Sequence, residues 1–326
     1  AKLLAFKPSV VHLHNFYHVL SPGILNVLAQ HKCTQSLRVV MTAHDYHLAC
    51  PNSGGAWFHW FTGKREVIDG RRLGLLSRSW DQRGPLYSTL KLLQHWWNYR
   101  WHHRQRVIDT VICPSRFVAE TLGPLGLPVT VLPHPAPSLA SHVAERSGRL
   151  QFVFAGRIEP EKGLRELLEC WPADLSLTVI GAGADMPRCQ ALAEARRLSV
   201  DFVGRLSHAE TLARIAAAHV LVQPSRVLET YGLTLIEALA CGTNLLAANR
   251  GAAPETIAAA GVGFLYELDE AASLATQLTV IRKQFDAGTL NCFDVSHFLG
   301  ERSEHGHVDA LLNIYGLRTQ ALRKAS

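Results

Sequence analysis

Residues 151–171 read QFVFAGRIEPEKGLRELLECW and contain a strand, a loop and a helix in succession. The run after Gln151 is apolar as far as Ala155, which indicates a strand covered on both faces. A helical pattern begins at Gly163 and continues to Trp171. A strand followed directly by a helix is half of a βαβ unit, so this stretch predicts a parallel sheet with helices on its faces.

The same alternation continues on both sides of this stretch. In the second half, further apolar runs predict strands at 176–180, 200–203, 220–223, 244–248 and 262–265. In the first half, looser runs predict strands at 10–14, 38–42, 110–113 and 129–132. A helix over 209–217 is preceded by Ser207 and Glu210, which have the spacing of a capping box. The chain is therefore predicted to be an α/β protein.

The length and one proline-rich segment divide the chain. Its 326 residues correspond to about two domains. Residues 133–150 contain three prolines followed by small and charged residues, as is typical of a linker. We expect four parts: a first domain over 1–135, a linker over 136–150, a second domain over 151–300, and a C-terminal helix over 301–326 that packs back on the first domain.

Composition excludes several classes of protein. Apolar residues make up 48% and charged residues 18%, unlike a disordered, collagen-like or coiled-coil chain. No apolar run reaches the ~18 residues of a membrane-spanning helix. Seven cysteines without a CxxC pair indicate reduced core thiols in a cytosolic protein. The formal charge of +6 favours anionic partners such as phosphates, nucleic acid or an anionic membrane face.

Residues 56–106 form a basic, tryptophan-rich insertion. Six of the seven tryptophans lie in it, and residues 64–106 carry ten Lys or Arg against three acids. One apolar stripe recurs at helical spacing: Leu86, Leu90, Leu93, Trp97 and Trp101. Arg100 and Arg104 are expected on the same stripe, at its C-terminal end.

Three interpretations of this insertion remain open. In the first, the stripe is ordinary core and the arginines face solvent. In the second, it belongs to a surface helix at a lipid boundary, with Trp and Arg at headgroup level. The third is a face for single-stranded nucleic acid, which also favours aromatic residues among basic ones. No nucleic-acid-binding module accompanies it, so nucleic acid is not expected as a partner.

Charged residues and glycines follow several predicted strands in the second half. Arg157 and Lys162 flank a loop bounded by Gly156 and Gly163, where two cations would bind a diphosphate. The next two strands are followed by Gly181, Gly183, Arg205 and Leu206. Loops beyond the carboxyl ends of parallel strands share one crevice, so we expect these residues in one ligand site.

The segment 224–242 carries the strongest signal. Glu229 and Glu237 lie eight residues apart, on either side of a glycine that precedes a helix. Three backbone amides at that helix start would be free to meet a phosphate: those of Gly232, Leu233 and Thr234. Glu237 could then accept both ribose hydroxyls, and Glu229 could accept hydroxyls of a sugar.

This ordered set of residues resembles the retaining glycosyltransferases of family 4, whose GT-B fold has two Rossmann-like domains with parallel sheets facing across a cleft. The similarity covers about residues 151–265: Gly-Arg…Lys-Gly, Gly-x-Gly, Val-Gly-Arg-Leu, Pro-Ser…Glu-x7-Glu and Gly-x-x-Pro-Glu. In the first half, residues 7–15, 42–51 and 113–117 are similar more weakly, and 42–51 has the His-Asp-Tyr…Cys-Pro pattern of polysaccharide-assembly members.

The resemblance implies a role for each site residue. The second domain would hold a UDP- or GDP-sugar, with Arg157 and Lys162 neutralising the diphosphate as it leaves. Glu237 would hold the ribose, while Glu229 and His44 would be the catalytic residues next to the transferred sugar. The first domain would lie on the acceptor side and contribute Asp45, Tyr46 and Arg116. Neither a metal nor another cofactor is implied, because cations and helix N-termini replace the metal.

The sequence also departs from the family pattern. Members normally begin with two or three further βα units, so we expect the first domain to be incomplete. Residues 251–253 read Gly-Ala-Ala where Gly-Gly is usual, and a contact to the donor sugar is expected to differ.

Two functions therefore stay open. One is a cytoplasmic, membrane-peripheral transferase that acts on a lipid-linked or other glycan acceptor with retention of configuration. Its surface contact with the inner face of the membrane would come from residues 56–106. The other is a catalytically impaired module that only binds a nucleotide sugar.

Overall fold

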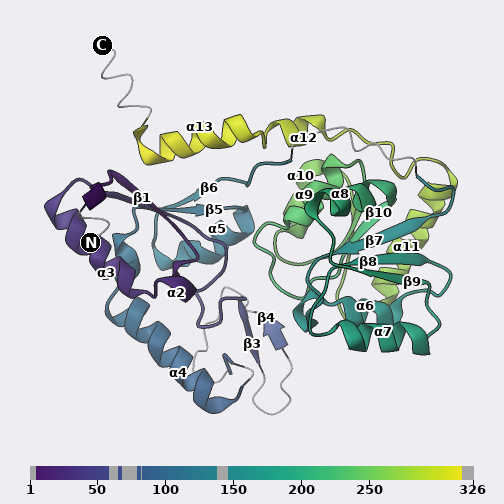
Figure 1. The fold of residues 1–326 in the computed structure, drawn as a ribbon, viewed down its shortest axis with the longest axis horizontal. Helices are drawn as coiled ribbons and strands as arrows, with labels where there is room; N and C mark the ends of the chain where they lie inside the picture. Colours follow the sequence, from purple (N-terminus) through teal and green to yellow (C-terminus); the bar gives the residue numbers. More distant parts are fainter. Residues whose placement is uncertain (1–4, 59–64, 68–78, 82, 138–145, 318–326) are drawn as a thin grey trace. The chain divides into compact units, whose positions relative to one another are not determined.

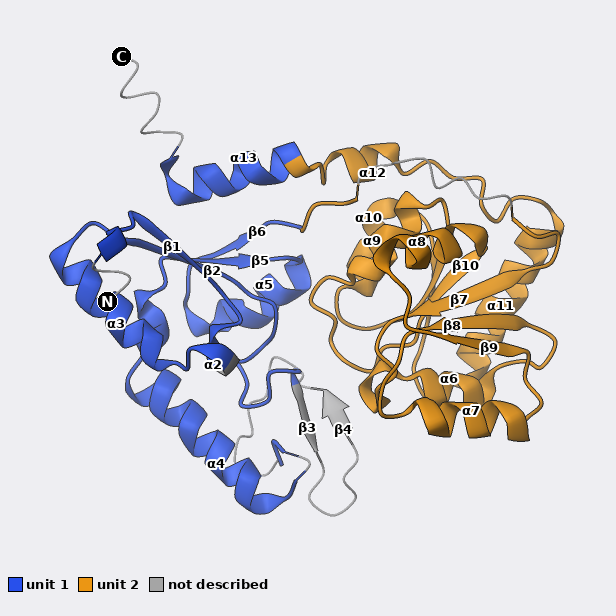
Figure 2. Cartoon of the chain, in the orientation of Figure 1, with its two compact units in different colours: residues 1–133, 305–326 blue, residues 134–304 orange. Residues whose placement is uncertain are grey.

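The computed structural model describes residues 5–58, 65–67, 79–81, 83–137 and 146–317. These residues form two compact units (Figure 2). Unit 1 comprises residues 1–133 together with 305–326, and unit 2 comprises residues 134–304. Part of the expected linker, 138–145, lies outside the described residues, and the described residues on either side of it belong to unit 2.

Unit 2 is built on a six-stranded parallel sheet with the order β12-β11-β10-β7-β8-β9 (Figure 1). Its strands are β7 (Gln151–Ala155), β8 (Ser176–Ile180), β9 (Val200–Gly204), β10 (Val220–Gln223), β11 (Asn244–Ala248) and β12 (Phe264–Tyr266). The predicted strands are confirmed, except that the last one begins at Phe264 and not at Val262. The capping box before the helix at 209–217 is confirmed as well, with reciprocal bonds between Ser207 and Glu210.

Helices cover both faces of this sheet and separate its core into two clusters. One face carries α8 (His208–Ala217), α9 (Leu233–Ala240) and α10 (Ala253–Ala260). The other carries α6 (Leu164–Cys170), α7 (Met186–Ala195) and α11 (Ala271–Asp286), and the short η5 (Pro160–Lys162) precedes α6. Because side chains alternate along a strand, Val153 packs into the first cluster while Phe152 and Phe154 pack into the second.

Unit 1 contains a four-stranded parallel sheet with the order β1-β2-β5-β6. Its strands are β1 (Val10–His14), β2 (Arg38–Thr42), β5 (Thr110–Cys113) and β6 (Val129–Val131). Its helices are α2 (Phe16–Val19), α3 (Gly23–Thr34), α4 (Pro85–His95) and α5 (Arg116–Leu122), with the short helical turns η3 (Arg104–Val107) and η4 (Gly123–Leu125). The α/β prediction with parallel sheets is thus confirmed for both units.

The C-terminal part continues from α12 (Ser296–Gly300) in unit 2 to α13 (Glu304–Tyr315), which is counted almost entirely with unit 1. Tyr315 at the end of α13 forms a 2.7 Å hydrogen bond with Nδ1 of His12 on β1. The other ring nitrogen of His12 is 2.8 Å from the Thr42 hydroxyl on β2. These bonds join α13, through His12 in the middle of β1, to the carboxyl end of β2.

The insertion at 56–106 differs from its sequence-based description in three ways. A two-stranded antiparallel hairpin, β3 (Ala56–Phe58) and β4 (Arg65–Val67), was not predicted. After α4, the turn widens into a π-helix, η2 (Trp96–Trp101), and the chain then reverses at His103. Arg104 therefore leaves the stripe, and its guanidinium donates to the Asn98 side chain.

The stripe of Leu86, Leu90, Leu93, Trp97 and Trp101 is exposed, so its interpretation as ordinary core is wrong.

The cysteine prediction also needs correction. Four cysteines are buried, but Cys33, Cys170 and Cys292 are exposed, although all seven are free thiols. Within the described residues, no helix is both long and apolar enough to cross a membrane.

Candidate functional site

A cavity of about 380 Å³ opens in unit 2 where β7, β8 and β9 end and α9 begins. Six residues predicted for a donor site line it: Arg157, Gly181, Arg205, Leu206, Thr234 and Glu237. Gly156, which begins the predicted diphosphate loop, lines it too, and the remaining lining residues were not predicted: Ala155, Ile180, Ala182 and Thr211. The carboxyl ends of three parallel strands therefore meet at one hollow, as the topology of such sheets requires.

Close backbone approaches shape this cavity. Gly181 has a φ of +136°, and a Cβ there would lie 1.9 Å from the Gly156 carbonyl oxygen. A Cβ on Gly183 would lie 2.1 Å from the Ile158 carbonyl oxygen, although Gly183 itself does not line the cavity. The Gly-x-Gly pair thus lets the loop after β8 pack directly on the loop after β7.

Two cations reach the cavity from different loops. Arg157 is 67% exposed, and its only described ion pair is a long one, 3.6 Å to Glu161. Arg205, which follows β9, is also exposed. Both guanidiniums can therefore turn toward an anionic ligand without breaking a buried contact.

The start of α9 adds backbone donors. Gly232 occupies the N-cap with a φ of +77°, and among the described residues no side chain caps this helix. The first amides of α9 therefore lack partners within the helix, which suits an anion such as phosphate. Thr234 lines the cavity, while the Leu233 side chain is exposed.

Glu237 lies one turn further along α9 and lines the same cavity. Its Oε1 atom is 2.9 Å from Nε2 of His208, the first residue of α8. His208 was missed by the sequence reasoning, although its place directly after the capping Ser207 could have pointed to it. The contact holds the Glu237 carboxylate at the cavity wall, where one oxygen remains available to hydroxyl groups.

Lys162 and Glu229 do not line the cavity, but the structure brings them together. Lys162 Nζ lies 2.6 Å from Glu229 Oε1, and the Ser225 hydroxyl donates to the same oxygen at 2.7 Å. The loop that carries Glu229 is also held by Arg226, which forks onto Asp269 at 2.7 and 3.0 Å. Six of the predicted donor residues therefore line the cavity, whereas Lys162 and Glu229 form an ion pair apart from its lining.

The residues predicted for the acceptor side lie in unit 1. His44 follows β2, and its Nε2 is 2.8 Å from Nδ1 of His14 at the end of β1. Asp45 pairs with the buried His47. Tyr46 is buried and meets Phe117 edge-on, so it supports the loop from within, whereas Arg116 is exposed at the start of α5.

The imidazoles at the ends of β1 and β2 favour their neutral form. Burial and the charge of His44 lower the pKa of His14. Burial also lowers the pKa of His44, although the nearby Asp45 carboxylate opposes this shift. A neutral pair can share one hydrogen bond, with one ring donating and the other accepting. Among the described residues, no three His, Cys, Asp or Glu side chains are grouped so that they could hold a metal ion.

Comparisons with known proteins agree with this geometry. Residues 139–284 match the family Glycosyl transferases group 1. A GDP-mannose-dependent monoacylated α-(1-6)-phosphatidylinositol monomannoside mannosyltransferase of Corynebacterium glutamicum is 31% identical over 113 residues, which are 31% of this chain and 30% of the relative. The phosphatidyl-myo-inositol mannosyltransferase of Mycobacterium leprae is 30% identical over 153 residues, 45% of this chain and 40% of the relative.

The similarity to these relatives spans well under half of their length. A solved structure extends the likeness of fold to the whole chain. Sucrose-phosphate synthase from Thermosynechococcus elongatus aligns with a TM-score of 0.71 and 19% identity, and covers 100% of this chain and 76% of that chain. Residues 139–284 are therefore similar to the glycosyl transferases group 1 family, and the chain as a whole has the GT-B fold.

Proposed function

We propose that the chain transfers a sugar from a nucleotide-diphosphate sugar to an acceptor, with retention of configuration at the anomeric carbon. One observation carries this proposal: Arg157, Arg205, the start of α9 and Glu237 surround a single cavity. Cations and free amides suit a diphosphate, and a carboxylate beside them suits the vicinal hydroxyls of a ribose.

In the transfer, the bond between the anomeric carbon and the diphosphate oxygen breaks, and the diphosphate keeps the electron pair. The acceptor hydroxyl forms the new bond on the same face of the sugar, and its proton passes to the leaving diphosphate oxygen. Arg157 and Arg205 oppose the negative charge that develops on the leaving group, and Lys162 joins them once its contact with Glu229 opens. In this scheme Glu229 and His44 act on the transferred sugar, and no metal or further cofactor is needed.

The donor is a UDP- or GDP-sugar, and the sugar is of the hexose class. The acceptor is a glycan carried on a lipid, on the side of Asp45, Tyr46 and Arg116. Two of the relatives support this acceptor, because one is a phosphatidylinositol monomannoside mannosyltransferase and the other a phosphatidyl-myo-inositol mannosyltransferase. A lipid-linked acceptor places the enzyme in the cytoplasm, peripheral on the inner face of the membrane.

The test begins with a screen of UDP, GDP and ADP, and of their sugars, for thermal stabilisation of the chain. Glu237→Gln should weaken binding of the stabilising nucleotide about tenfold to a hundredfold, because charge-assisted hydrogen bonds contribute about 1.5–3 kcal/mol. Glu194→Gln is the matched control, since Glu194 is exposed on α7, away from the cavity. If no nucleotide binds, or if both variants bind alike, the donor site is misplaced. Binding without sugar transfer to any acceptor would instead identify a module that only binds nucleotide sugars.

A further inference from the structure

A row of large apolar side chains lies on the outside of α4 and η2. Its members are between 43% and 70% exposed: Leu86, Leu90, Leu93, Trp96, Trp97 and Trp101. We call this row the outer face. Six such residues on one helical segment exceed the scattered apolar side chains of an ordinary surface, and contiguous apolar patches of this kind mark interaction sites.

The π-helical turn of η2 extends the outer face by one tryptophan. In an α-helix, residues five apart point in directions about 140° apart, and their rings do not meet. In η2 the turn is wider, and the rings of Trp96 and Trp101 lie 5.4 Å apart. Single π-turns inside helices are frequently found at functional sites.

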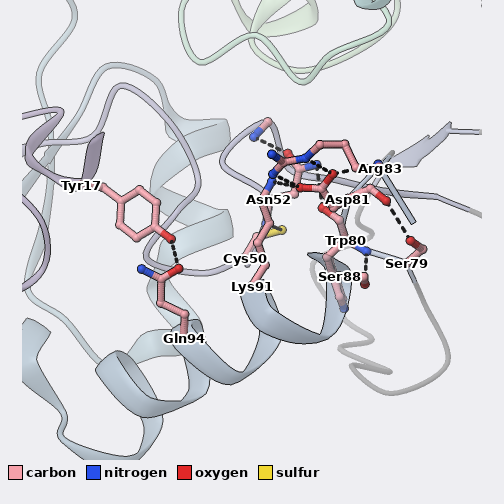
Figure 3. Close-up of polar contacts among 11 residues, drawn as sticks. Tyr17, Cys50, Asn52, Ser79, Trp80, Asp81, Arg83, Ser88, Lys91 and Gln94 are labelled. Carbon is pink, nitrogen blue, oxygen red and sulfur yellow. Dashed lines mark hydrogen bonds and ion pairs between the residues drawn. The ribbon is translucent and has the colours of Figure 1, made fainter. Parts of the chain in front are cut away.

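The opposite side of α4 is polar and already occupied (Figure 3). The Ser88 hydroxyl accepts a 2.7 Å bond from the backbone amide of Trp80, and Lys91 pairs with Asp81 at 2.9 Å. Nearer the end of the helix, on the flank next to Leu90, the exposed Gln94 accepts a bond from the Tyr17 hydroxyl. These contacts fix the rotation of α4, so the outer face cannot turn inward without breaking them.

Positive charge accompanies the outer face. Residues 83–108 contain five Lys or Arg and no Asp or Glu, and because Arg83 and Lys91 pair with Asp81, the excess charge comes from Arg100, Arg104 and Arg106. Where η2 ends, a pocket of about 310 Å³ is lined by Arg100, His103 and Arg106 and by seven uncharged residues: Leu48, Tyr99, Gln105, Pro124, Leu125, Gly126 and Leu127. The side chains of Arg100, His103 and Arg106 are exposed, and the two guanidiniums carry positive charge. The apolar row therefore ends at a pocket with two guanidiniums, Arg100 and Arg106, which can bind the phosphate of a larger ligand.

We propose that the outer face rests on an anionic lipid bilayer, with its tryptophans at headgroup level and a lipid phosphate in the pocket of Arg100, His103 and Arg106. Apolar side chains would enter the boundary of the acyl chains, while the cations would meet the lipid phosphates. The proposal concerns a surface of unit 1 and does not depend on the sugar transfer proposed for the chain.

The charge and composition of the outer face favour an anionic bilayer over two other partners, a second copy of the chain and single-stranded nucleic acid. A second copy of the chain on the same face would bring two carboxylate-free basic segments together, and like charges oppose such a symmetric contact. Single-stranded nucleic acid would stack on the aromatic rings, but the three leucines offer no π-surface to a base. Leucine, tryptophan and arginine side by side are the composition of a lipid interface.

The experiment is co-sedimentation of the full chain with vesicles. We expect binding to vesicles of phosphatidylcholine with 30% phosphatidylglycerol, and binding at least tenfold weaker to phosphatidylcholine alone. Acyl chains brominated near the headgroup should quench tryptophan fluorescence, because Trp97 and Trp101 enter the boundary. High salt should weaken the binding, since it screens the basic residues.

Two variants separate the two parts of the surface. Trp97→Ser with Trp101→Ser should lower the affinity at least tenfold and remove the quenching. Arg100→Glu with Arg106→Glu should remove the preference for anionic lipid. Substitutions at exposed positions elsewhere are the matched controls: Val280→Ser with Val308→Ser for the apolar pair, and Lys283→Glu for the charge reversal. Circular dichroism and thermal unfolding show whether each variant is folded.

Several results would overturn the proposal. Wild-type chain that stays in the supernatant with anionic vesicles would do so, as would tryptophan variants that bind like wild type. A dimer that the tryptophan variants convert to monomer would assign the face to a second copy, and tight salt-dependent binding to oligonucleotides with none to vesicles would assign it to nucleic acid. Nucleotide binding, measured without vesicles, is a separate readout, so failure here is distinguishable from failure of the donor site.

Discussion

The Lys162 ammonium lies 2.6 Å from the Glu229 carboxylate, although 67 residues separate them in sequence. Lys162 ends the short turn before α6, and Glu229 sits in the loop between β10 and α9. Both side chains are only about one-fifth exposed. Each neutralises the other, so in the proposed function a donor would have to separate this partly buried ion pair before Lys162 could reach its diphosphate.

This pairing leads to a prediction for Glu229→Gln. Removing the carboxylate charge frees Lys162 for the diphosphate, so the affinity for free UDP or GDP should stay equal or rise by up to about tenfold. Sugar transfer should fall by at least a hundredfold, because the contact to the transferred sugar is lost. Calorimetry with the nucleotide and a transfer assay with its sugar measure the two effects on one preparation.

Lys162→Met is the matched counterpart, because it removes the other charge of the pair. Lys162→Met should lower the affinity both for the free nucleotide and for the donor sugar, since the diphosphate loses a cation that would bind it. If Glu229→Gln lowered the affinity for the free nucleotide as strongly as Lys162→Met does, Glu229 would contact the nucleotide and not the sugar.

A second prediction concerns the glycine that closes the back of the cavity. The Cβ added by Gly181→Ala would lie 1.9 Å from the Gly156 carbonyl oxygen, at a φ that L-residues rarely adopt. The two loops must move apart, which costs about 1–3 kcal/mol for the overlap and about 1 kcal/mol for the backbone strain. We expect lower stability by urea unfolding of unit 2 and loss of nucleotide binding by calorimetry.

Gly204→Ala is a close control for that change. Gly204 also has a positive φ, +75°, at the end of a neighbouring strand, but nothing lies within 4 Å of a Cβ there. It should cost only the strain of about 1 kcal/mol. Equal losses of stability and binding in the two variants would mean that backbone strain, and not the close approach of the loops, matters at Gly181.

The strands of unit 2 and part of its site could be predicted from the sequence, because the local patterns and the topology of the sheet agree there. Apolar runs alternate with helices, and a parallel sheet then brings the strand ends together, so Arg157, Arg205 and Glu237 could be assigned to one site before any coordinates. The ion pair between Lys162 and Glu229 could not be predicted, since it depends on how two loops fold over the strand ends. The contact of His208 with Glu237 depends in the same way on the packing of α8 beside α9.

The insertion shows where sequence patterns fail. Apolar residues at helical spacing predict a helix, but they do not say which side of it faces the core. Here Ser88 and Lys91 find buried polar partners, and these fix the helix with its apolar side outward. The sequence did contain one indication of a surface helix: the apolar residues at helical spacing are followed directly by Trp and Arg. The π-turn at Trp96 and the reversal at His103 have no clear sequence signature.

A third prediction concerns acid. Burial and the neighbouring His14 and His44 lower the pKa of His12 from 6.5 to about 4. The unfolded chain therefore binds more protons between pH 6.5 and 4, and the free energy of unfolding falls as the pH falls through that window. His12→Asn should flatten this dependence by about 1–2 kcal/mol, allowing for partial exposure. Unfolding of unit 1 by urea at pH 7, 5.5 and 4 measures it, with the exposed His305→Asn as the control; equal slopes would contradict the prediction.

The last prediction concerns the contact that fixes α4. Asp81 is nearly buried, and it accepts two bonds from Arg83, at 3.0 and 2.9 Å, and one ion pair from Lys91 (Figure 3). The bonds from Arg83 hold the pKa of Asp81 well below its usual range. The carboxylate therefore contributes stability above pH 3.8, the unfolded pKa, which is lost as the pH falls further.

Asp81→Asn should destabilise unit 1 by about 2–3 kcal/mol, less than a fully buried pair because Arg83 is well exposed. Asp174→Asn removes an exposed ion pair with Arg282 and should cost less than about 1 kcal/mol. Amide hydrogen exchange over residues 84–101 gives the local readout. Exchange there should quicken in Asp81→Asn and stay unchanged in Asp174→Asn, since only the first variant loosens the polar side of α4. Equal exchange in both would show that α4 is held by its backbone packing alone, with its inner polar contacts playing no part in keeping the apolar side outward.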